Sequence, residues 1–104
     1  EDGVTGVRVR EVASGDESEL ETAAVFAFIG LTPNSGLAGG VAPLDSTGRI
    51  RVDAGMRTPV KGLAAAGNVR QHSPHRAAAA MGDGAAAAVS LDRYLSTGEW
   101  SGPD

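Results

Sequence analysis

The junction between residues 62–67 and the segment after them carries the side chains best suited to bind a ligand. The small-residue run 62–67 predicts a short strand, and residues 68–75 form a loop into a helix that begins near Arg76. Ligands of α/β sheets usually bind where a loop leads from the carboxyl end of a strand into a helix. Asn68 can donate and accept hydrogen bonds there, and the free N–H groups at the helix start favour an electronegative ligand group. A turn without a ligand at Gly67 and Asn68 is the alternative, because short motifs are weak evidence.

The other polar residues form no recognisable catalytic or metal-binding set. His72 and His75 are three residues apart, with no cysteine in the chain and no carboxylate near them before Asp83. They predict a solvated loop, because a zinc site needs three or four ligands. The aspartates lack the spacing of an acid–base pair, and the serines lack a nucleophile elbow. Asp83 is expected to form a surface ion pair with Arg70 and Arg76, worth well under about 1 kcal/mol.

Composition narrows the class of protein. A chain of 104 residues fits one small domain, and its net charge of −4 gives no electrostatic footprint for nucleic acid. The absence of cysteine excludes disulfides and Cys-based redox chemistry within the chain. No apolar run approaches the ~20 residues of a membrane span, and no signal peptide is visible, so we expect a cytoplasmic location. Much of the 41% hydrophobic fraction is alanine, which predicts a thin core.

Two strands are expected before residue 30, and the second runs into an apolar segment. Valines predict a strand within residues 1–12, and a turn at residues 15–16 leads into a second strand around residues 18–22, so the two form an antiparallel hairpin. Residues 24–29 are continuously apolar and end at Gly30. Such a run, bounded by chain breakers, predicts a strand that is buried on both faces.

The remaining residues predict one further short strand and one long helix. Residues 31–40 read as a loop, residues 49–52 as a short strand, and the alanine-rich segment from 76 to 95 as a helix. Its three-to-four spacing predicts a buried stripe of Met81, Ala85, Ala88, Leu91 and Leu95. Gly82 and Gly84 each destabilise a helix by about 1 kcal/mol relative to alanine. They therefore indicate close approach by another backbone or by a flat ligand.

Several blocks of sequence, taken in order, carry a family resemblance. They are VFAFIGLTPN at 25–34, GRIRVD at 48–53, MRT at 56–58, PVKGLAAAGNVR at 59–70 and the helical residues 76–88. Over residues 4–95 the chain resembles the C-terminal part of the thioredoxin-reductase-like pyridine nucleotide–disulfide oxidoreductases. The resemblance implies an α/β flavoprotein with two dinucleotide-binding domains. As an isolated piece, of α+β character, this chain would contribute an N-terminal β-hairpin, further short strands and one long C-terminal helix.

The resemblance also implies where a flavin would bind. It places residues 1–30 at the end of the NAD(P)H-binding domain and residues 31–104 in the C-terminal part of the FAD-binding domain. The block 62–68 resembles the family's second flavin motif, in which an aspartate after the glycine holds the ribityl chain, and this chain has Asn68 in its place. The following helix resembles the one whose N-terminal amides face the pyrimidine edge of the isoalloxazine ring; the family often has Arg-Gln there, and this chain has Arg-Ala. The implied cofactor contacts are Gly67, Asn68, Arg76, Ala77 and Ala78.

Most of the family's machinery is missing from this sequence. It contains neither glycine-rich βαβ fingerprint, since Gly82-Asp83-Gly84 lies inside a helix and follows no strand, and it has no Cys-x-x-Cys. The resemblance implies the C-terminal portion of an enzyme that passes electrons from NAD(P)H through FAD to a disulfide or another acceptor. This chain would supply flavin contacts only, with no catalytic residue, no metal and no NAD(P)H site, and would be inactive alone.

Two other interpretations stay open. The chain could be a truncated or degenerate non-catalytic module that self-associates or pairs with a partner, or a generic small-ligand-binding α/β domain. The expected partners are the N-terminal portion of the reductase or a second copy of this chain.

Overall fold

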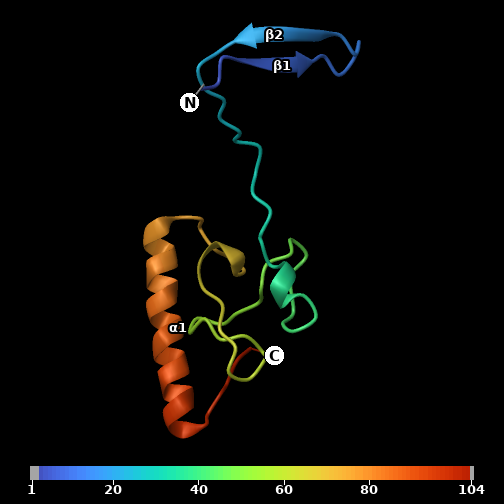
Figure 1. Cartoon of the computed structure of the whole chain (residues 1–104). Helices are drawn as coiled ribbons and strands as arrows, with labels where there is room; N and C mark the ends of the chain where they lie inside the picture. Colours follow the sequence, from blue (N-terminus) through green and yellow to red (C-terminus); the bar gives the residue numbers. More distant parts are fainter. Residues whose placement is uncertain (1–2, 104) are drawn as a thin grey trace. The chain divides into compact units, whose positions relative to one another are not determined.

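The computed structural model describes residues 3–103, which divide into two compact units between Gly30 and Leu31 (Figure 1). The assignment of residues 1–30 to a NAD(P)H-binding domain and of residues 31–104 to an FAD-binding domain stays a prediction.

The first unit contains the predicted hairpin. Strands β1 (Gly6–Arg10) and β2 (Glu17–Glu21) pair antiparallel, with Val7 opposite Leu20. Two arginines of β1 form ion pairs with glutamates directly opposite on β2. Exposed cross-strand pairs of this kind contribute roughly 0.2–1 kcal/mol each. Alternation and complementary charge therefore specify this register, and the hairpin prediction is confirmed.

The apolar run at residues 24–29 is not a strand in the described structure, so that prediction is wrong. These residues pair with no other segment, and Phe28 and Ile29 are 90% and 96% exposed. The physical reason is the lack of sheet neighbours: a doubly buried strand needs a ladder partner and a layer on each face, and β2 pairs with β1.

The two short strands predicted in the second unit do not form as strands. Residues 49–52 and 62–67 make only isolated bridges, centred on Ile50 and Ala64. Alanine and glycine are poor strand formers. In addition, Asp53 Oδ1 accepts two backbone N–H groups within the next four residues, each at 2.9 Å. Such local bonds close a turn in place of a strand ladder.

The core of the second unit is small, as the composition predicts. Ala42, Ile50 and Ala65 are its buried centre, and partly buried aliphatic residues pack around them: Ala38, Val52, Val60, Leu63 and Val69. The largest fully buried side chain among the described residues is Thr58. Its hydroxyl donates to the Leu63 carbonyl at 2.8 Å. Polar turns therefore stabilise this unit beside a modest apolar core.

One long helix follows two short 3-10 turns. The turns are η1 (Gly36–Ala38) and η2 (Gly67–Val69), and helix α1 (Ala77–Thr97) confirms the predicted C-terminal helix. The helix ends where Gly98 adopts a φ of 72° and its N–H donates to the Tyr94 carbonyl at 2.8 Å. A left-handed glycine is a common helix terminator. Among the helices that the structure describes, none is long and apolar enough to cross a membrane.

The predicted buried stripe of α1 is wrong. Four of its five residues are exposed, including Met81 at 76% and Leu95 at 82%, and Leu91 is half-buried. The buried positions are Asp83 and Ala87. In an alanine-rich helix the few large side chains do not decide which face turns inward. Here the helix meets backbone groups of two turns, since Asp83 accepts the Gly67 N–H and Ser90 donates to the Gly55 carbonyl, and small or polar side chains suit such contacts better than large apolar ones.

The two helix glycines do not receive another part of the described chain. A side chain built at Gly82 or Gly84 would meet no atom within 4 Å, and both residues are exposed. Close approach by a neighbouring backbone is therefore not found among residues 3–103.

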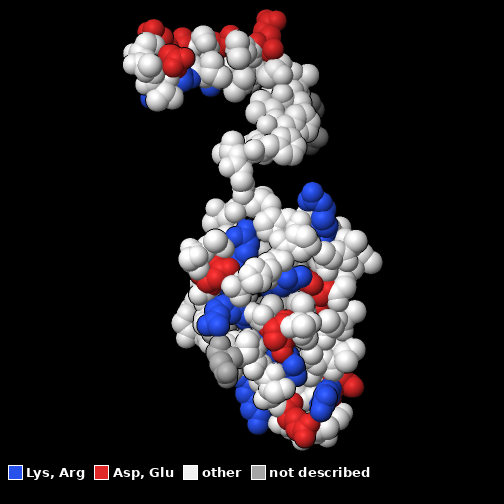
Figure 2. Space-filling model, turned by 180° about the vertical axis from the view of Figure 1, so that it is seen from behind, with Lys and Arg blue, Asp and Glu red and all other residues white. Residues whose placement is uncertain are grey.

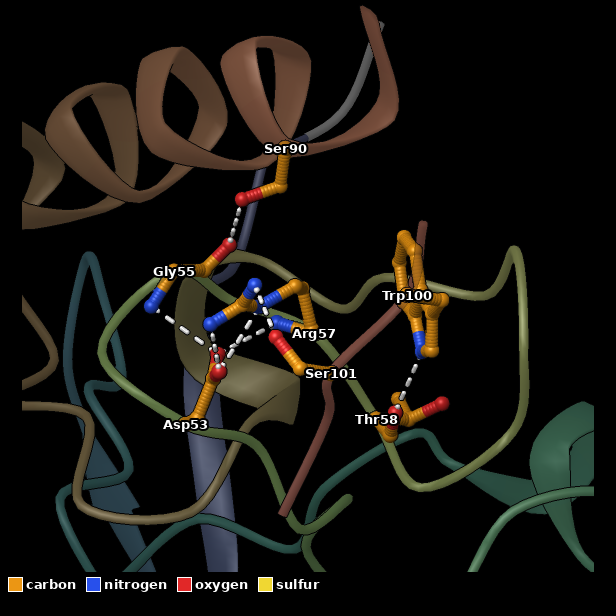
Figure 3. A network of polar contacts seen from close by, with 7 residues as sticks. All are labelled: Asp53, Gly55, Arg57, Thr58, Ser90, Trp100 and Ser101. Atoms are coloured by element: carbon orange, nitrogen blue, oxygen red, sulfur yellow. Dashed lines mark hydrogen bonds and ion pairs between the residues drawn. The ribbon is translucent and has the colours of Figure 1, made fainter. Parts of the chain in front are cut away.

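A polar network joins α1 and the C-terminal tail to one turn of the second unit (Figure 3). The Ser90 hydroxyl of α1 donates to the Gly55 carbonyl at 2.7 Å, and Asp53 pairs with Arg57 at 2.6 Å. Arg57 also donates to the Ser101 hydroxyl at 3.0 Å. The turn thus holds both the middle of the helix and the residues that follow it.

Trp100 completes this attachment. Its indole N–H donates to the Thr58 carbonyl at 3.0 Å, and its ring packs edge-on against Tyr94 with centroids 5.4 Å apart. Such an aromatic pair contributes about 0.5–1.5 kcal/mol beyond area burial.

We predict that Trp100→Phe lowers the free energy of unfolding by about 1 kcal/mol, because it removes the indole hydrogen bond and keeps an aromatic ring. Trp100→Ala should cost about 3 kcal/mol, since the ring contact is lost as well. Urea unfolding followed by circular dichroism of α1 measures both. Leu37→Ala, at an exposed position, is the control. A Trp100→Ala variant as stable as this control would contradict the proposed attachment.

Candidate functional site

The turn η2 holds two of the residues that sequence reasoning selected. Gly67 is buried and has a φ of 80°, a conformation that favours glycine. A Cβ added to it would lie 3.6 Å from the Cβ of Ala80 on α1. Asn68, at the middle of the turn, is exposed, and its carboxamide oxygen accepts from the Ser73 hydroxyl at 3.2 Å. The turn therefore packs against the helix and presents Asn68 outward, with an amide group that can donate to a ligand.

A single carboxylate joins this turn to α1. Asp83 Oδ2 accepts the Gly67 backbone N–H at 3.0 Å and Arg70 Nε at 2.8 Å, and Asp83 Oδ1 accepts Arg70 Nη2 at 2.7 Å. Asp83 is only 6% exposed. The predicted partner Arg70 is thus confirmed, whereas the prediction of a surface pair is wrong. Arg76 is not part of the interaction: it is exposed and donates to the His75 carbonyl at 3.1 Å.

Electrostatics keep this carboxylate ionised. The hydrogen bonds from the Arg70 guanidinium hold the pKa of Asp83 below its usual value, the Gly67 N–H and the charge of Arg70 act in the same direction, and burial opposes them. The same hydrogen bonds raise the pKa of Arg70. Both groups therefore remain charged at neutral pH, where a bidentate, charge-assisted pair is strongest.

The start of α1 leaves its first N–H groups open to a ligand. The N-cap, Arg76, makes no side-chain capping hydrogen bond, and no acidic residue lies in the first turn. The first intrahelical bond runs from the Ala80 N–H to the Arg76 carbonyl at 3.0 Å. Ala77 and Ala78 precede it and are exposed. The positive end of the helix dipole is therefore not neutralised locally.

A hollow of about 300 Å³ opens beside Asn68. Its lining is Leu31, Thr32, Pro33, Asn34, Arg49, Asn68, Val69 and His75. Arg49 Nη2 lies 3.2 Å from His75 Nε2. The hollow thus combines an apolar lining with a few hydrogen-bonding groups, as ligand pockets commonly do.

The structure brings the predicted contact residues together in part. Gly67 and Asn68 lie on a turn that is bonded to α1, and the exposed Arg76, Ala77 and Ala78 form the start of that helix. Sequence reasoning missed Arg49 and His75 beside the hollow, and it missed the burial of Asp83 and its hydrogen bond to Gly67. The signal for Asp83 was available, because it is the one charged residue between positions 77 and 91.

The second unit has mixed charge on one of its faces. On the face shown in Figure 2, acidic and basic side chains are interspersed over the second unit. Within residues 3–103 no three metal-ligating side chains gather at one point. His72 is exposed and His75 is half-buried.

Comparison with known proteins identifies the class. The chain belongs to the pyridine nucleotide-disulphide oxidoreductases, a family that it matches over residues 1–84.

Within that family the chain is thioredoxin-reductase-like, which confirms the resemblance seen in the sequence. It is 41% identical over 95 residues to NADPH-dependent thioredoxin reductase 3 of Arabidopsis thaliana, covering 90% of this chain and 18% of that one. It is 39% identical to the thioredoxin reductase of Mycolicibacterium smegmatis, covering 88% and 30%. The crystal structure of the T. acidophilum thioredoxin reductase superposes with a TM-score of 0.69 at 37% identity, covering 89% and 31%. The chain therefore spans about a third or less of the length of these relatives.

We predict that the free energy of unfolding falls as the pH drops below about 4, the ordinary pKa of an aspartate. Because folding lowers the pKa of Asp83, its stabilisation is present above the unfolded-state pKa and is lost as the pH falls through the folded-state value. Asp83→Asn should lower stability at neutral pH by about 3 kcal/mol and weaken the acid dependence. Urea unfolding over a pH series measures both effects.

Asp92→Asn is the control for this series, because it changes an exposed carboxylate on the same helix. It should keep the acid dependence of the unsubstituted chain. An Asp83→Asn variant that loses stability with acid as steeply as this control would contradict the buried pair.

Proposed function

We propose that this chain forms the C-terminal, flavin-contacting part of a thioredoxin-reductase-like enzyme that passes electrons from NAD(P)H through FAD to a disulfide or another acceptor. One observation carries the proposal: two sets of hydrogen-bond donors, the turn with Asn68 and the uncapped start of α1, are held together. Asp83 belongs to α1 and accepts a backbone N–H of that turn. Membership of the family supports it.

The donor set fits a flavin. The Asn68 carboxamide can hydrogen-bond a ribityl hydroxyl, taking the position of the aspartate that the family resemblance implies. The N–H groups of Ala77 and Ala78 would face the pyrimidine carbonyls, where the helix dipole favours negative charge. Gly67 lets the turn adopt its conformation, and Arg76 begins the helix. FAD, when bound, supplies the redox chemistry.

The size of the hollow agrees with the proposal that this chain contacts only part of the FAD molecule. About 300 Å³ lies at the lower end for pockets that enclose small ligands, and a dinucleotide is larger than that. The chain would therefore hold one part of the cofactor and orient it, while the remaining contacts, the NAD(P)H site and the reacting thiols would come from the N-terminal portion. Such an enzyme is expected in the cytoplasm.

A second candidate rests on one observation. The apolar residues Val25, Phe26, Phe28 and Ile29 are exposed, and apolar segments of this kind favour association. They would support a non-catalytic module that pairs with itself or with another protein. Sedimentation of the isolated chain separates the two candidate functions. Stable oligomers, together with no flavin binding by either the isolated chain or the chimera, would favour the non-catalytic module.

The direct test is a chimera in which this chain replaces the corresponding C-terminal segment of the M. smegmatis thioredoxin reductase. We expect the chimera to bind FAD, while the isolated 104-residue chain does not bind it tightly. A folded chimera without affinity for FAD would overturn the proposed function.

In this chimera we predict that Asn68→Ala weakens FAD binding about fivefold, the effect of losing one hydrogen bond. Asn68→Asp should tighten it several-fold, because a charged acceptor makes a stronger hydrogen bond to a hydroxyl. Quenching of flavin fluorescence on titration of the apoprotein measures the dissociation constant. Ser96→Ala, an exposed change near the helix end, is the control. Equal FAD affinity in Asn68→Ala and the control would contradict the role of Asn68.

A further inference from the structure

We propose that Asp83 and Arg70 are positioning residues for the flavin: the pair fixes the carboxamide of Asn68 relative to the first N–H groups of α1. The proposal rests on the proposed function, since it concerns how the flavin contacts are held. Neither side chain is proposed to touch the cofactor. Their effect would pass through the turn Gly67–Val69.

The geometry shows how one carboxylate can fix a whole turn. Asp83 accepts the N–H of Gly67 at the first residue of the turn and the guanidinium of Arg70, the residue immediately after it. The Arg70 N–H in turn donates to the Gly67 carbonyl at 3.2 Å. Asn68 lies between these two attachment points and is the exposed residue of the turn.

The opposite side of the turn is fixed to a different segment. The Ile50 N–H donates to the Val69 carbonyl at 3.0 Å, and the Gln71 N–H donates to the Ile50 carbonyl at 2.8 Å. Among residues 3–103, the hydrogen bonds that connect the turn with α1 all end on Asp83. Removing that carboxylate would leave the turn attached to the Ile50 segment but free to shift along the helix.

The opposite charges of Asp83 and Arg70 also keep the start of α1 favourable for an electronegative ligand group. A lone buried carboxylate in the second turn of α1 would oppose negative charge near the start of the helix. Arg70 neutralises it through two hydrogen bonds, so the helix dipole still favours an electronegative group. Asparagine at position 83 has a single acceptor oxygen and could not accept the arginine fork and the Gly67 N–H together. Lysine at position 70 would keep the charge but lose the fork.

A double-mutant cycle on FAD affinity in the chimera tests the proposal. Asp83→Asn should weaken FAD binding by up to about fivefold, no more than Asn68→Ala, because its effect passes through that carboxamide. If Asp83 acts by positioning Asn68, the double variant should bind FAD within about twofold of Asn68→Ala alone. A double variant weakened by the product of the two single effects would overturn the proposal, because the pair would then act independently of Asn68.

The matched control is Asp53→Asn. Asp53 also accepts backbone N–H groups and pairs with an arginine, but it lies in the turn that holds the C-terminal tail. Its effect on FAD affinity should be under twofold and should multiply with that of Asn68→Ala. If Asp83→Asn fails to fold, as monitored by circular dichroism, Arg70→Lys takes its place in the cycle with the same expected non-additivity. An Asn68→Ala variant with unchanged FAD affinity would contradict the role of Asn68, and a folded chimera that does not bind FAD would contradict the proposed function; both outcomes are distinct from additivity in the cycle.

Discussion

The buried carboxylate of Asp83 is the constraint on which the candidate site depends. It is a charged group with almost no exposure to water, and such a group is tolerated only when its oxygens are paired. Arg70 and the Gly67 N–H supply that pairing. Because Asp83 belongs to α1 and its partners are the first residue of the turn and the residue after it, satisfying one carboxylate also sets the relative position of helix and turn.

Polar side chains also stabilise the rest of the second unit. Its apolar core is small, so order comes largely from side chains that accept backbone N–H groups: Asp45, Asp53 and Asp83 each do so. No buried side-chain nitrogen or oxygen atom in the described part of the chain lacks a hydrogen-bond partner. Polar closure of this kind can define turns accurately without a large hydrophobic layer. It suits a segment whose proposed task is to present a few donors, with bulk burial supplied by the remainder of an enzyme.

Local sequence patterns predicted the hairpin and the long helix correctly. Features that depend on long-range contacts were not predicted as well. The hairpin follows from alternation and turn residues, and α1 from alanine content with Gly98 as its stop. The strand at 24–29 was wrong because no described segment pairs with it. The helix face was wrong because alanine carries little directional information. Gly67, Asn68 and the helix start were selected from the sequence, and their role as ligand contacts stays a prediction. The pairing of Asp83 with Arg70 was also predicted, whereas the burial of Asp83 and its bond to the Gly67 N–H needed the structure.

The most direct measurement is a crystal structure of the FAD-loaded chimera. We predict that the Asn68 carboxamide lies within hydrogen-bond distance, about 3.5 Å or less, of a ribityl hydroxyl. We also predict that the Ala77 and Ala78 N–H groups face the pyrimidine carbonyls, while Asp83 still accepts from Gly67 and Arg70. A flavin bound without contact to Asn68 or to the start of α1, or an Asp83 released from the turn, would contradict the account.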